Sequence, residues 1–139
     1  MVQLVDTHVS EACAARLGSS SLPMPTMEEY KGIDFYCDIA IADVISLQKE
    51  YESESVLAFH HTHPHWPVHI VVVPKKHIES LLTLSEEDTP LLIELIEVIK
   101  QIAKKLETEH GSARVLTNLG SYQDSKHLHF HVCTGEEIV

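Results

Sequence analysis

The chain is poor in basic side chains, and this shortage limits its partners. It has 139 residues, with 21 Asp and Glu against 10 Lys and Arg, for a formal net charge of -11. Affinity for a nucleic acid backbone comes mainly from clustered Lys and Arg that displace counterions. The charge balance therefore argues against a nucleic acid polymer as the partner, but it does not exclude a small nucleotide as a ligand.

Long hydrophobic runs and cysteines are also scarce. No apolar stretch approaches the roughly 20 residues that a membrane-spanning helix needs, and the N-terminus lacks a basic segment followed by an apolar one. We therefore expect no membrane partner and a cytoplasmic location. Cys13, Cys37 and Cys133 are odd in number and far apart, which favours free thiols over a disulfide framework.

The length predicts one hydrophobic core, since 139 residues are too few to form two cores of useful size. Residues 1–31 contain a Gly-Ser tract and two prolines. This composition predicts an N-terminal extension with a short helical segment. Residues 32–139 should then form a single domain.

The expected elements of this domain are five strands and one long helix. Apolar residues recur at helical spacing from Leu92 to Leu106, after the capping sequence Ser85–Asp88 and before Gly111. Strands are expected at 43–47, 56–59, 68–73, 114–118 and 127–132. Strands on both sides of one helix, without regular alternation, favour an α+β fold with a mostly antiparallel sheet.

The last expected strand carries three histidines at alternate positions, His127, His129 and His131. Successive side chains of a strand point to opposite faces, so the three imidazoles share one face. Five further histidines cluster between residues 60 and 69. Imidazoles in this pattern can bind a metal, act as nucleophile or acid and base, or simply be buried with satisfied hydrogen bonds. Spacing alone does not separate metal binding from catalysis.

Together these residues form an ordered pattern. It comprises Val56–His60, Pro67–Ile78, Asn118, and Gln123 four residues before His127. In this pattern the chain resembles the histidine triad (HIT) family. The resemblance implies a HIT-like fold with a five-stranded, mostly antiparallel sheet, a homodimer, and nucleotidyl hydrolase or transferase activity.

The resemblance also implies roles for four histidines. His129 would attack the α-phosphorus of a nucleotide and form a covalent nucleotidyl-histidine that water then cleaves. The backbone carbonyl of His127 would hold the tautomer of His129. His131 would bind phosphate and help the leaving group depart, and His69 would pack against His127 and orient it.

A second set of residues would bind the nucleotide, and it departs from the family at two positions. The set is His60, His61, Asn118, Gln123, Asp124 and Ser125. His61 stands where nucleotide-binding members usually carry an aspartate that accepts from both ribose hydroxyls, and a neutral imidazole has one acceptor nitrogen at most. Asp124 stands where the family usually has Ser or Thr, and a carboxylate there would repel phosphate unless it turned away, took up a proton or paired with Lys126.

Many bacterial relatives hold a structural zinc with a Cys-x-x-Cys pair, which here reads Asp34 to Cys37. The resemblance therefore implies a zinc site formed by Asp34, Cys37, His69 and His127. One thiolate has become a carboxylate, which binds zinc less tightly in such a site. No metal is required for the chemistry itself.

The leading hypothesis is a hydrolase that cleaves a purine nucleoside monophosphate derivative, either a phosphoramidate or a dinucleoside polyphosphate. One alternative is a nucleotide-binding or regulatory module in which the changes at His61 and Asp124 have weakened turnover. Another is a metal-binding protein that uses the dense histidines.

Overall fold

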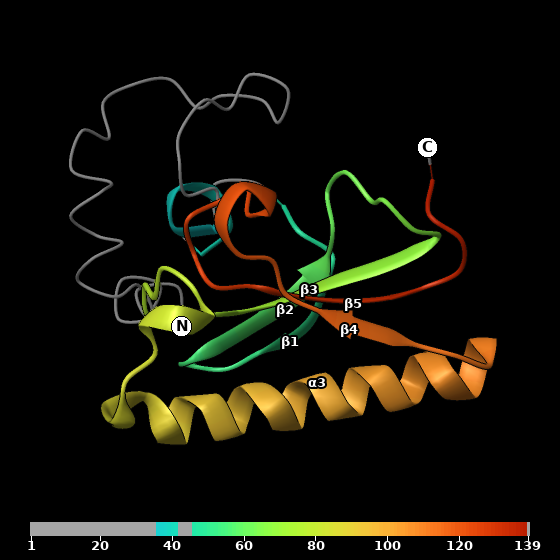
Figure 1. Ribbon diagram of the computed structural model, residues 1–139. Coiled ribbons are helices and arrows are strands. Elements are labelled where there is room, and N and C mark those ends of the chain that lie inside the picture. Colours follow the sequence, from blue (N-terminus) through green and yellow to red (C-terminus); the bar gives the residue numbers. More distant parts are fainter. Residues whose placement is uncertain (1–35, 42–45, 139) are drawn as a thin grey trace.

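The computed structural model describes residues 36–41 and 46–138. Its centre is a five-stranded sheet in the order β1-β2-β3-β5-β4, in which every neighbouring pair is antiparallel. The strands are β1 (Lys49–Glu52), β2 (Val56–His60), β3 (Val68–Pro74), β4 (Arg114–Leu116) and β5 (Phe130–Thr134). One long helix, α3 (Thr89–His110), crosses one face of the sheet (Figure 1). The predicted α+β fold is confirmed.

Both faces of the sheet are covered, because alternate residues of each central strand pack in opposite directions. On one face, residues such as Ala58, Val72 and Val132 pack with buried residues of α3 in the main core. On the other, Phe59 and Val71 pack against the short helix η3 (Tyr36–Ile41). Two-sided burial explains why β2 and β3 read as continuous apolar runs.

The helix begins and ends where its capping sequences predicted. The one-turn helix η5 (Glu86–Asp88) precedes it, and the backbone N–H of Ser85 donates to a carboxylate oxygen of Asp88 at 3.0 Å. At the other end Gly111 adopts φ 91°, a left-handed conformation that costs glycine little. Among the described residues, no helix is both long and apolar enough to cross a membrane.

Two predicted strand positions were wrong. The first strand lies at 49–52, and the described part of the predicted run, 46–47, is not a strand. β1 is an edge strand whose half-exposed position tolerates charged residues, so hydrophobicity did not mark it. β5 begins only at Phe130, because the Leu128 N–H donates instead to the carbonyl of Ile78 at 2.6 Å. The expected N-terminal helical segment and the extension lie outside the described residues.

Candidate active site

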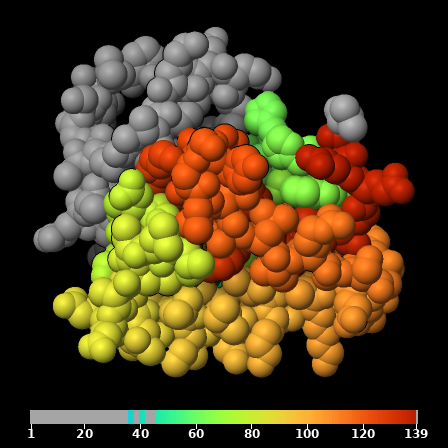
Figure 2. All heavy atoms as spheres, in the orientation of Figure 1, coloured from blue at the N-terminus to red at the C-terminus, as the bar shows by residue number. Residues whose placement is uncertain are grey.

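A cavity of about 710 Å³ opens on the side of the sheet away from α3. The loop after β4, which carries the short helix η6 (Gly120–Tyr122), arches over this side of the sheet (Figure 1). The loop 61–67 and the segment after β5 lie next to each other on the surface (Figure 2), where the Ile138 N–H donates to the His65 carbonyl at 2.7 Å. Three segments distant in sequence therefore surround the cavity.

His129 presents a lone pair to this cavity. Its Nδ1 lies 2.7 Å from the carbonyl oxygen of His127, and a carbonyl only accepts, so Nδ1 carries the proton and donates it there. In the neutral ring Nε2 is then the nitrogen without a proton. Two contacts hold the residue, since the Tyr36 ring lies 4.6 Å away between centroids and the Thr117 hydroxyl donates to the His129 carbonyl at 2.7 Å. His129 is thus held in one orientation and is only 4% exposed.

His131, the next residue on the same face, carries its proton on the opposite nitrogen. The backbone N–H of His65 donates to Nδ1 of His69 at 3.0 Å, which leaves Nε2 of His69 as its proton-bearing nitrogen. That Nε2 donates to Nδ1 of His131 at 2.7 Å. The neutral His131 therefore bears its proton on Nε2 and is a hydrogen-bond donor.

These tautomers require neutral rings, and the surroundings favour neutrality. Burial, followed by the neighbouring imidazoles, lowers the pKa of His69 to about 3 and that of His131 to about 3. The same two causes lower the pKa of His61 to about 4. These three imidazoles of the cavity are thus uncharged near neutral pH.

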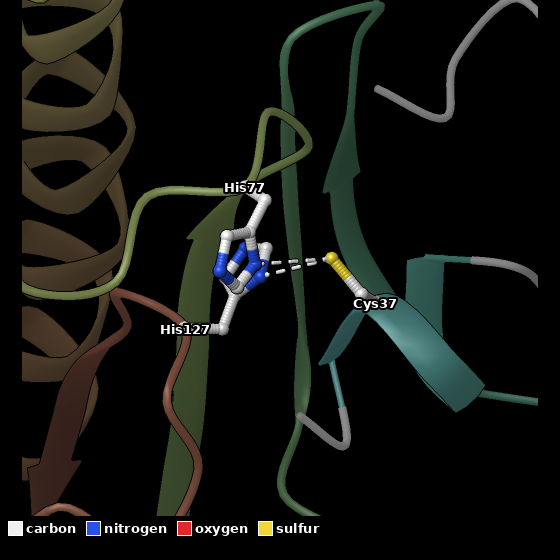
Figure 3. A group of neighbouring side chains, drawn as sticks. All are labelled: Cys37, His77 and His127. Carbon is white, nitrogen blue, oxygen red and sulfur yellow. Dashed lines mark hydrogen bonds between the residues drawn. The ribbon is translucent and has the colours of Figure 1, made fainter. Parts of the chain in front are cut away.

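A second cluster consists of Cys37, His77 and His127 (Figure 3). The Cys37 sulfur is 3.3 Å from Nδ1 of His127 and 3.4 Å from Nδ1 of His77, and the three potential ligand atoms all lie within 4.8 Å of one another. Nε2 of the fully buried His127 donates to the Pro74 carbonyl at 2.8 Å, which makes Nδ1 its lone-pair nitrogen. A histidine that donates its other N–H to a carbonyl is the usual arrangement at a metal site.

This cluster corrects the predicted ligand set. His69 was expected beside Cys37 and His127, but its Nε2 lies 2.7 Å from Nδ1 of His131 and it is not part of the cluster. His77 occupies the expected place of His69 in the cluster, and Asp34 lies outside the described residues. Sequence spacing did not show which histidine the end of β3 brings next to His127.

The sulfur of Cys37 is disulfide-bonded in the structure, whereas Cys133 is a buried free thiol. The expectation of free thiols throughout is therefore wrong for Cys37. Zinc binds the thiolate, so the cluster would take a metal only in the reduced state. One sulfur and two imidazoles are ligands that zinc prefers, and they would fill three of the four positions of a structural zinc site once that condition is met.

The predicted nucleotide-binding residues fall into two groups. Asn118, Asp124, Ser125 and His61 line the cavity. His60 instead pairs with Glu50 at 2.6 Å, and the Gln123 amide donates to the Glu79 carbonyl at 2.7 Å, so neither side chain lines the cavity in this conformation. Lys126 donates to backbone carbonyls, which leaves the suggested pairing with Asp124 unmade.

Several cavity residues were not predicted from the sequence. They are Tyr36, Phe59, Thr62, His63, His65, Trp66, Leu116, Ser121, Tyr122 and Glu137. The histidines between residues 60 and 69 are dense in the sequence, but alternation alone did not show that this loop and the triad line one cavity. Trp66, the single tryptophan, could have indicated that this loop lines the cavity, because a large aromatic side chain beside clustered histidines suits the wall of a binding site.

Comparisons with known proteins identify the family of the chain. A family model described as "Scavenger mRNA decapping enzyme C-term binding" matches residues 35–137. An "Uncharacterized HIT-like protein" from Chlamydia muridarum is 33% identical over 96 residues, which cover 68% of this chain and 76% of that protein.

Two solved structures are similar as well. A histidine triad protein from Clostridium difficile shares 36% identity and a TM-score of 0.64, over 84% of this chain and 97% of that one. A protein described as a HIT family hydrolase from Clostridium thermocellum shares 30% identity and a TM-score of 0.62, over 69% of this chain and 85% of that one. The family match spans the β-sheet, α3 and the triad itself. The chain therefore belongs to the histidine triad (HIT) family.

Proposed function

We propose that the protein is a hydrolase that cleaves at the α-phosphorus of a nucleoside monophosphate derivative through a covalent intermediate on His129. The observation that carries this proposal is the pair of opposite tautomers in one cavity. His129 offers a lone pair on Nε2, while His131 offers an N–H. A nucleophile beside a donor is what substitution at a phosphoryl group needs.

In the first step, Nε2 of His129 forms a bond to phosphorus and the bond to the leaving group breaks. The proton stays on Nδ1 and is donated to the His127 carbonyl, which stabilises the positive charge that develops on the ring. The N–H of His131 would donate a hydrogen bond to a phosphoryl oxygen or to the leaving atom, an oxygen or a nitrogen, and the departing group takes up its proton from solvent. In the second step, water attacks phosphorus, the phosphorus–nitrogen bond breaks, the proton of the water is released to solvent, and Nε2 of His129 regains its lone pair.

The similarity to a protein described as a HIT family hydrolase supports the reaction class. Two substrate classes are candidates, a phosphoramidate and a dinucleoside polyphosphate, and they differ in their leaving group. The test is hydrolysis of an adenosine phosphoramidate and a diadenosine polyphosphate by the wild type, by His129→Gly, and by His110→Gln as a control on the exposed end of α3.

His129→Gly should lower kcat by about 10³-fold or more, as expected for a lost nucleophile. The wild type should also yield an adenylylated His129 peptide on rapid acid quench and mass spectrometry. Undiminished turnover by His129→Gly would refute the nucleophile assignment. Nucleotide binding without hydrolysis of either substrate would instead support the regulatory module.

We further propose that Cys37, His77 and His127 hold a structural zinc when Cys37 is reduced. A bound zinc would supply no step of the reaction but would fix His127, whose carbonyl orients His129. Reduced wild type should bind zinc stoichiometrically and gain thermal stability, whereas Cys37→Ala should not. Cys133→Ala is the control, because that buried thiol lies on β5 outside the cluster. Equal zinc contents in the two variants would contradict the site.

We also propose a homodimer. The edge strand β1 carries Lys49, Glu50 and Glu52, which discourage strand pairing, whereas the opposite edge strand β4 exposes Val115 at 46%. Pairing through β4 would extend the sheet across two copies. Multi-angle light scattering would measure the mass in solution directly.

A further inference from the structure

His61 offers the cavity a hydrogen-bond donor where the resemblance led us to expect an acceptor. The backbone N–H of His63 donates to Nδ1 of His61 at 2.9 Å, so the neutral ring carries its proton on Nε2. Among the hydrogen bonds of the described residues, none involves this Nε2, and His61 lines the cavity. The N–H is thus available to a bound molecule.

The ring of His61 is held in place by stacking. It lies parallel to the His69 ring, with centroids 4.3 Å apart and an interplanar angle of 21°. Both nitrogens of His69 already form hydrogen bonds, one with the His65 N–H and the other with His131, so His69 does not accept from His61. The His61 ring is also 6.1 Å from that of His131. The two rings that carry N–H donors are therefore neighbours in the cavity lining.

The charge of this wall is consistent with an acceptor ligand. Burial and neighbouring imidazoles lower the pKa of His61 to about 4, so it is a neutral donor near pH 7. His63, His65 and Trp66 continue the wall without any carboxylate. An aspartate at position 61 would instead present two acceptors and a negative charge, which repel an anionic group.

Two carboxylates do line the cavity, but from other segments. Asp124 belongs to the loop after β4 and Glu137 to the segment after β5. They weaken the binding of any second anion, so their removal should strengthen it. The donor wall itself, formed by residues 61–66, contains no acidic residue.

We propose that His61 makes this end of the cavity a donor subsite for a second anionic group on the substrate, a phosphate ester on the sugar, in place of a free ribose diol. This inference rests on the proposed nucleotide hydrolase function. A phosphate ester is an acceptor at every free oxygen and so matches an N–H donor, whereas a diol gains most from a partner with two acceptors. The substrate class would be a nucleotide phosphorylated at the 2′ or 3′ position.

The test is isothermal titration calorimetry of the full chain with AMP, ADP, adenosine 2′,5′-bisphosphate and adenosine 3′,5′-bisphosphate. Wild type should bind one of the two bisphosphates at least about 10-fold more tightly than AMP, the scale of one charge-assisted hydrogen bond. His61→Asp should abolish this preference, and His61→Asn, which keeps an N–H donor, should retain much of it. Asp124→Asn and Glu137→Gln should each increase it.

The outcomes separate the two proposals. Equal affinities for AMP and both bisphosphates, or a preference unchanged in His61→Asp, would overturn the donor subsite while leaving hydrolysis of AMP-linked substrates intact. Tighter binding of ADP than of either bisphosphate would place the second phosphate on the polyphosphate chain and overturn the sugar assignment. Absence of both nucleotide binding and hydrolysis would overturn the proposed function and this inference with it.

Discussion

Backbone groups, more than other side chains, decide what each histidine does at the residue scale. The carbonyls of His127 and Pro74 fix the protons of His129 and His127, and the N–H groups of His63 and His65 fix those of His61 and His69. Four identical side chains thereby acquire different roles. One imidazole offers a lone pair, another is a hydrogen-bond donor and a third is a candidate metal ligand. The sequence does not distinguish them.

His69 gives the first residue-scale prediction. His69→Leu removes the donor that holds the tautomer of His131. It should lower kcat by about 100-fold, the lower end of what a positioned proton donor contributes, with a smaller change in KM. His69→Gln retains an N–H that can reach Nδ1 of His131 and should stay within about 10-fold of wild type. Equal losses in the two variants would show that His69 contributes packing alone.

At the element scale, the site depends on a close approach between the loop 61–67 and the end of β5. Gly135 follows β5 with φ 94°, and a Cβ there would lie 2.8 Å from the side chain of Pro67. Gly111, at the end of α3, has a similar φ of 91°, but a Cβ there would meet nothing within 4 Å. Both glycines therefore have a left-handed backbone conformation, but only at Gly135 would a Cβ clash with another side chain.

These glycines form a matched pair for mutation. Gly111→Ala should destabilise the protein by about 1–2 kcal/mol through left-handed backbone strain alone. Gly135→Ala should cost about 1–3 kcal/mol more, because the ring of Pro67 is rigid and must be displaced. Urea unfolding would measure both, and nucleotide affinity should fall only in Gly135→Ala, since Pro67 adjoins the donor wall. Equal unfolding free energies would argue against the contact.

At the scale of the whole molecule, stability should depend on pH through the neutral histidines of the cavity. The folded pKa values of His61, His69 and His131 lie near 4, 3 and 3, whereas the unfolded chain has the ordinary value of 6.5. Between about pH 6.5 and pH 3 the unfolded state therefore binds more protons than the folded state. Stability should be complete above about pH 6.5 and fall as the pH drops through this window.

The measurement is the urea midpoint at pH 7.5, 6 and 5. The decrease on acidification should be smaller in His61→Asn, which removes one of the three groups, and unchanged in His110→Gln, whose histidine is exposed at the end of α3. A midpoint that stays constant down to pH 5 would contradict neutral, buried imidazoles.

Periodicity and capping in the sequence determined the class of fold, because they report local burial. The continuous apolar runs predicted β2 and β3, the capping residues and Gly111 bounded α3, and the alternating triad placed Leu128, Phe130 and Val132 against the core. The same signals missed β1, an edge strand whose polar residues are specified by pairing with β2 rather than by hydrophobicity.

By itself, then, the sequence determined the α+β class, the family resemblance and the three histidines at which chemistry is expected. Only the tertiary structure decided that His77 rather than His69 joins Cys37 and His127, that His60 and Gln123 turn away from the cavity, and which nitrogen of each ring carries a proton. The physical reason is that periodicity is a local property, whereas ligand sets and tautomers depend on backbone groups brought together from distant segments.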